Sequence, residues 1–90
     1  MYLTVRLYIY FEVQSRGFME NLEIFAKRVK ELRKQRRLSQ TELGEVLGLT
    51  HKSISTIESG LRGTTIEKLI LLAKYFEVST DYLLGLKDEP

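Results

Sequence analysis

Two glycines inside an apolar helical pattern constrain this chain more than any other feature. Between Ser39 and Gly60 the apolar residues recur at helical spacing, yet glycine occupies positions 44 and 48. A glycine in a helix costs about 1 kcal/mol relative to alanine. We expect Gly48 to end one short helix in a turn with positive φ. We expect Gly44 to lie at the closest approach to the next helix, where a side chain would push the two apart.

Two short helices joined by a glycine turn form a helix-turn-helix, and capping signals mark their ends. Ser39 and Glu42 form a capping box at the start of the first helix, Thr50 caps the second, and Gly60 ends it. The residues expected to face the core are Leu43, Val46, Leu47, Leu49, Ile54 and Ile57.

The residues after Gly60 predict two more helices. A second capping box, Thr64 to Glu67, precedes a helix over residues 65–76, and Ser79 opens a short last helix. The apolar stripe of the longer helix is Ile66, Leu69, Ile70, Ala73 and Phe76, and the last helix carries Tyr82, Leu83 and Leu84. Residues 87–90 form a tail.

Before Asn21 the apolar residues alternate with other residues, whereas after it they recur at helical spacing. Alternation over residues 2–13 predicts a strand, and Ser15 to Gly17 predicts a turn. A helix over residues 22–36, with Asn21 as its N-cap, follows. The strand pairs with the same strand of a second protomer, covers its own domain, or lies outside the natural protein, because Met19 is a credible start. The domains expected are therefore a 1–18 extension, a 19–86 helical domain and an 87–90 tail.

Charge is concentrated in the helix of residues 22–36 and its end. Seven of the eleven residues from Lys27 to Arg37 are basic and only Glu31 is acidic, although the net charge of the chain is +2. Such asymmetry favours a polyanionic partner.

Several other classes are disfavoured by the composition. There is no cysteine and only one histidine, His51, so we expect no disulfide and no metal or other cofactor. The scattered carboxylates Glu42, Glu45 and Glu58 have no nucleophile or base beside them, so we expect no enzyme. Without a signal layout or an apolar run long enough for a bilayer, we expect a cytoplasmic location, in a prokaryotic nucleoid or for a phage gene product, and no membrane partner.

The stretch "LSQTELGEVLGLTHKSISTIESG" resembles the Cro/C1-type (XRE-type) helix-turn-helix of phage and bacterial regulators. The resemblance includes the Ser-Gln pair, small Gly44, Gly48 in the turn and Glu58-Ser59-Gly60. It extends upstream to "RVKELRKQRR" and downstream to "TTIEKLILLAKYFEVSTDYLLG", covering residues 22–86. It implies an all-α, five-helix, lambda repressor-like DNA-binding domain, to which this chain adds an N-terminal β-strand.

The spacing turns Ile54 and Ile57 inward, so the opposite face of that helix should read bases in the major groove. The base-reading residues expected there, which the resemblance also implies, are His51, Lys52, Ser55 and Thr56. Phosphate contacts are expected at the N-terminus of the preceding helix, in the following loop and at the basic run. Those residues are Gln40, Thr41, Ser59, Arg62, Gly63, Thr64 and Arg36 or Arg37. The resemblance also pairs Arg33 with Glu58 as a structural ion pair.

These features predict a transcriptional regulator of double-stranded DNA, most simply a homodimeric repressor of an inverted-repeat operator. The dimer surface is expected among Leu71, Tyr75, Leu83, Leu84 and Leu86, unless these residues only complete the core. The alternative is a protein-interaction module on the same fold, such as an antitoxin, whose partner is a toxin or an anti-repressor.

Overall fold

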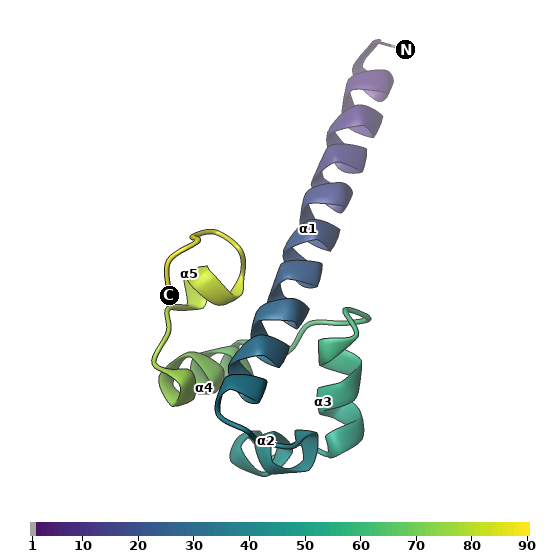
Figure 1. Cartoon of the computed structure of the whole chain (residues 1–90). Coiled ribbons are helices and arrows are strands. Elements are labelled where there is room, and N and C mark those ends of the chain that lie inside the picture. The colour runs from purple at the N-terminus through teal and green to yellow at the C-terminus, as the bar shows by residue number, and fades with distance from the viewer. Residues whose placement is uncertain (1) are drawn as a thin grey trace.

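The computed structural model is all-helical over the residues it describes, the backbone of residues 2–90 and the side chains of residues 17–90. Its elements are α1 (Tyr2–Gln35), α2 (Gln40–Leu47), α3 (His51–Glu58), α4 (Ile66–Phe76) and α5 (Thr80–Leu83). Figure 1 shows α2 to α5 gathered around the C-terminal half of α1, while its N-terminal half extends beyond them. Within the described part of the chain, no helix is both long and apolar enough to cross a membrane.

The predicted strand and turn are wrong, because residues 2–17 belong to α1. A strand needs a neighbouring strand for its N–H and C=O groups, and residues 2–90 contain none. A helix satisfies these groups within its own segment, and lengthening an existing helix avoids the cost of nucleation. The expected side-chain alternation over residues 2–13 lies outside the side chains that the structure describes.

One apolar core joins all five helices. Phe25 and Val29 of α1, Ile54 of α3 and Leu72 of α4 are each at most 3% exposed. The other core members are Leu43, Leu47, Ile57, Ala73, Phe76 and Leu83. The core therefore fixes α3 through its inner face.

The predicted start and end of α2 are confirmed. The Ser39 hydroxyl accepts from the Glu42 N–H, and the Glu42 carboxylate accepts from the Ser39 N–H. Gly48 ends the helix with φ of 69°. A methyl group on Gly44 would overlap the Leu49 carbonyl oxygen, so this glycine faces the turn before α3 rather than the helix itself.

The inner faces of α2 and α4 are narrower than the sequence pattern predicted. Val46 and Ile70 are each 41% exposed, and Ile66 is 77% exposed. Ile66 is the first residue of α4, where the chain is still leaving the loop. The N-cap of α4 is Thr65 and not Thr64, because the Thr65 hydroxyl accepts from the Lys68 N–H. The N-cap of α5 is Ser79, as predicted.

The end of the chain is attached to α1 by Arg28 and Asn21. The Arg28 guanidinium donates to the carbonyls of Tyr82 and Lys87 and lies 3.3 Å from the Asp88 carboxylate. Asn21, predicted as an N-cap, lies within α1 and donates its side-chain N–H to the Leu84 carbonyl at 2.6 Å. These contacts set α5 and the residues after it against the C-terminal half of α1.

Candidate nucleic-acid interface

The turn between α2 and α3 sets the direction in which α3 presents its side chains. The Leu49 N–H donates to the Gly44 carbonyl at 2.7 Å, which closes the end of α2. The Thr50 hydroxyl then accepts from the Ser53 N–H and begins α3. Ile54 and Ile57 are buried on one side of α3, which leaves His51, Lys52 and Ser55 to solvent on the other.

The four predicted base-reading residues lie on the outer side of α3, though not equally far out. His51, Lys52 and Ser55 are exposed, whereas Thr56 is half-buried. The Thr56 hydroxyl donates to the Lys52 carbonyl at 2.9 Å, a bond within the helix that occupies its proton. The other three side chains are free of the core, and they supply donors and acceptors of the kinds that recognise base edges.

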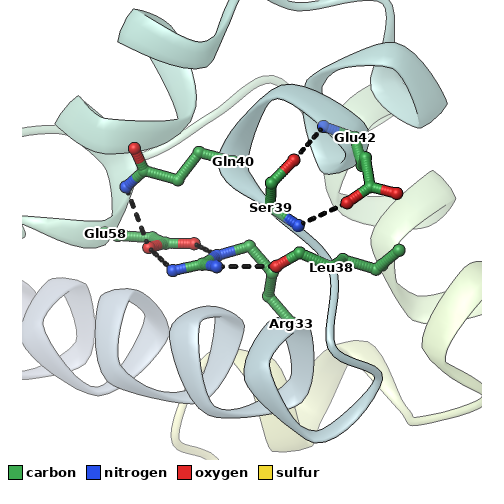
Figure 2. Close-up of polar contacts among 6 residues, drawn as sticks. All are labelled: Arg33, Leu38, Ser39, Gln40, Glu42 and Glu58. Atoms are coloured by element: carbon green, nitrogen blue, oxygen red, sulfur yellow. Dashed lines mark hydrogen bonds and ion pairs between the residues drawn. The ribbon is translucent and has the colours of Figure 1, made fainter.

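A buried guanidinium fixes the far end of α3 to α1 (Figure 2). Arg33 donates to both carboxylate oxygens of Glu58, at 2.6 and 2.9 Å, and to the Leu38 carbonyl at 2.8 Å. The hydrogen bond to Glu58 raises the pKa of Arg33 above its ordinary value, and partial desolvation opposes this rise. The pair that the resemblance predicted is therefore present, with both side chains at most 10% exposed.

Gln40 joins this network from the first residue of α2. Its side-chain amide donates to the Glu58 carboxylate at 3.3 Å, as Figure 2 shows. Thr41, the next residue, is exposed. The first N–H groups of a helix lack intrahelical partners and attract anions, so the start of α2 is suited to a phosphate.

The loop after α3 lies next to the outer face of that helix. Ser59 is exposed and its hydroxyl donates to the Thr56 carbonyl at 2.7 Å. Arg62 is exposed and lies 3.5 Å from the Ser53 hydroxyl oxygen. Gly63 and Thr64 are half-buried at the end of the loop.

Sequence reasoning missed the part of Ser53 in this arrangement. Its hydroxyl contacts both the Thr50 cap and the Arg62 guanidinium. The spacing of three residues from the cap signals the first contact. No sequence pattern signals the second, because it depends on the path of the loop.

The two remaining arginines differ in their surroundings. The Arg36 guanidinium lies over the rings of Tyr75 and Phe76, at 5.1 and 5.3 Å, and 4.0 Å from the Glu77 carboxylate. It is thus held at the end of α4 and is not brought to α3. Arg37 is exposed and has a positive φ of 56°.

Comparison with known proteins gives the fold and the family. The helix-turn-helix family model matches residues 29–83. The control protein C.SmaI of Serratia marcescens is 40% identical over 75 residues, which cover 80% of this chain and 89% of that protein. The uncharacterized HTH-type transcriptional regulator YobD of Bacillus subtilis is 34% identical over 67 residues. That match covers 74% of this chain and 60% of YobD, so the chain spans less than two thirds of that relative.

Two solved structures have the same arrangement of helices. The P22 c2 repressor, crystallised with a synthetic operator, aligns with a TM-score of 0.66 and 30% identity over 70% of this chain and 96% of that one. The restriction-modification controller protein C.AhdI of Aeromonas hydrophila aligns with a TM-score of 0.63 and 28% identity. That alignment covers 71% of this chain and 97% of C.AhdI. The chain belongs to the Cro/C1-type helix-turn-helix family of DNA-binding transcriptional regulators.

Proposed function

We propose that this regulator is a homodimeric repressor that places α3 in the major groove of an inverted-repeat operator. The observation that carries the proposal is the division of α3 into two faces. Ile54, Ile57 and Glu58 hold the helix from inside, and His51, Lys52 and Ser55 stand exposed on the outside. A repressor with the same fold has been crystallised with operator DNA.

The outer face of α3 supplies specific base contacts in this proposal. Lys52 donates to guanine O6 and N7, and His51 and Ser55 donate or accept at neighbouring edges. Thr56 contributes its methyl group against a thymine methyl, because its hydroxyl proton is used within the helix.

Phosphates on either side of the groove are bound by the groups that surround α3. Gln40 and Thr41 meet one strand at the N-terminus of α2. Ser59, Arg62, Gly63 and Thr64 meet the backbone from the following loop. Of the two arginines after α1, we assign this role to Arg37, because Arg36 is engaged with α4.

One domain reads one half-site, so a dimer reads two half-sites about 34 Å apart on one face of the duplex. The two-fold symmetry of the dimer requires an inverted repeat. Repression then follows by occlusion of a promoter.

Selection of duplexes from a random pool by the purified chain, at near-physiological salt, tests the proposal. We expect enrichment of an inverted repeat with half-sites one helical turn apart. Lys52→Ala should weaken binding to the selected site by about 5- to 100-fold and relax one base position, as loss of a specific base contact does. Lys74→Ala removes an equal charge from an exposed position on α4 and should change affinity less than about twofold.

Binding without enrichment would leave only the phosphate attraction and would contradict operator recognition. The protein-interaction alternative would then be favoured, and a toxin-like protein should co-purify. Equal losses from Lys52→Ala and Lys74→Ala would contradict the placement of α3 in the groove.

A further inference from the structure

An apolar groove lies between α1, the loop after α3, the start of α4 and the residues that follow α5. It has a volume of about 680 Å³, and Phe18, Leu22, Leu69, Leu84 and Leu86 are among its lining residues. Two of these residues are unusually exposed for their size, Phe18 at 68% and Leu86 at 65%. Contiguous exposed apolar surface of this kind marks a binding site on a protein that is otherwise well packed.

The chain contains a segment suited to such a groove but unable to reach its own. Residues 2–13 hold only two charged side chains, Arg6 and Glu12. A helix with so few charged side chains is expected to be buried against a partner. Yet α1 is one helix from Tyr2 to Gln35, with Gly17 inside it, so the segment before Phe18 continues along the helix axis. Figure 1 shows this half of α1 extending past the other helices.

We propose that the groove binds the N-terminal half of α1 from a second copy of the chain. The two α1 helices then run antiparallel about a two-fold axis, and each copy fills the groove of the other. Such an interface is isologous, because the same segment and the same groove occur in both copies. This inference rests on the homodimer in the proposed function and specifies which surfaces form it.

The N-terminal segment is long enough for this arrangement. Residues 2–16 form about 22 Å of helix at the usual rise. In an antiparallel pair, this length lies beside the neighbour's α1 from its middle onward, where Phe18 and Leu22 border the groove. Exchange doubles the contact, since two grooves are covered at once.

The mass of the protein in solution without DNA tests the proposal. We expect the full chain to be a dimer, and Leu86→Asp to weaken dimerisation by at least tenfold while helical content is unchanged. Leu61→Asp is the matched control, since Leu61 is 77% exposed and is not among the groove-lining residues. Removal of residues 2–16 should have the same effect as Leu86→Asp.

Cross-linking tests which segment occupies the groove, because the chain has no native cysteine. Leu86→Cys protein should be mixed with Leu7→Cys, Ile9→Cys or Phe11→Cys protein and oxidised. At least one mixture should give a disulfide-linked heterodimer. Leu61→Cys protein, used in place of Leu86→Cys in the same mixtures, should give none.

A dimer that survives both Leu86→Asp and the truncation would overturn the inference and place the interface elsewhere. A chain that stays monomeric at high micromolar concentration would also overturn it, and would leave the groove to a different protein. A surviving dimer leaves the homodimer of the proposed function in place, whereas a monomer counts against that homodimer as well. DNA recognition is tested separately, by enrichment in the duplex selection, so its failure is distinguishable from failure of this inference.

Discussion

Gly44 shows how a single hydrogen atom in place of a side chain shapes the motif. A methyl group there overlaps the Leu49 carbonyl, which is backbone and cannot move aside without disturbing the turn. Gly17 also lies in a helix, but among the described residues nothing lies within 4 Å of the position that its methyl group would occupy. The two glycines therefore have the same helix propensity, but a methyl group would meet backbone atoms at Gly44 and would not at Gly17.

We expect Gly44→Ala to lower the free energy of unfolding by about 1–3 kcal/mol, as overpacking does. Gly17→Ala should raise it by up to about 1 kcal/mol, the propensity difference between the two residues. Urea unfolding followed by circular dichroism measures both changes. A stabilising effect of Gly44→Ala would contradict the close approach at the turn.

Arg33 and Arg36 are three residues apart and should differ strongly in their contribution to stability. Arg33→Ala leaves the Glu58 carboxylate buried without its partner, which costs about 3–5 kcal/mol. The Arg36 side chain is 40% exposed and its ion pair is long, so Arg36→Ala should cost less than about 1 kcal/mol. Equal melting temperatures for the two variants would refute the structural role of the Arg33–Glu58 pair.

At the level of the element, the start of α2 introduces a pH dependence. Hydrogen bonds from the Ser39 backbone N–H and the Ser39 hydroxyl lower the pKa of Glu42 below its ordinary value. The folded state thus binds this proton less tightly than the unfolded state does. The contribution of Glu42 to stability is complete above the unfolded pKa, about 4.3, and is lost as the pH falls through the lower folded pKa.

We expect Glu42→Gln to flatten the dependence of unfolding free energy on pH between about 5 and 3, relative to the parent chain. Glu45→Gln, on the exposed side of the same helix, is the control and should leave the slope almost unchanged. Denaturant titrations at several pH values measure the slope. An unaltered slope in Glu42→Gln would mean that the capping carboxylate does not titrate in this window.

The elements that could be predicted from sequence are those with local causes. The caps at Ser39, Thr50 and Ser79 and the turn at Gly48 each depend on a few adjacent residues, and the structure has all of them. The strand over residues 2–13 was wrong because alternation indicates a strand only where a second strand is available.

The parts of the site that could not be predicted depend on distant segments. Ile70 was expected in the core and is 41% exposed, because the rotation of α4 is set by packing on the other helices. The position of the Arg36 guanidinium over the Tyr75 and Phe76 rings of α4, about forty residues later in the sequence, was also not predicted. Periodicity within one helix carries no information about either contact.

At the scale of the whole molecule, the exposed charges should determine how binding depends on salt. Arg37→Gly removes one cation at a position whose positive φ suits glycine. We expect the logarithmic salt slope of operator binding to fall by about 0.9, the contribution of one phosphate contact. Stability should stay equal or rise by about 0.5–1 kcal/mol.

Glu77→Gly is the matched control for this effect, since Glu77 has the same positive φ of 56° at the end of α4. It should change stability in the same direction while the salt slope stays as in the parent chain. Titrations at several salt concentrations separate the two variants. A slope unchanged by Arg37→Gly would show that another group neutralises that phosphate.

The separation of the two faces of α3 has a consequence for how regulators of this kind diverge. The inner residues Ile54 and Ile57, with the carboxylate of Glu58, keep the helix in place, and they are not the residues that face a ligand. Substitutions at His51, Lys52 and Ser55 therefore escape the selection that acts on folding. Under the proposed function, duplicated copies can therefore drift to new operators one base at a time while the scaffold stays the same.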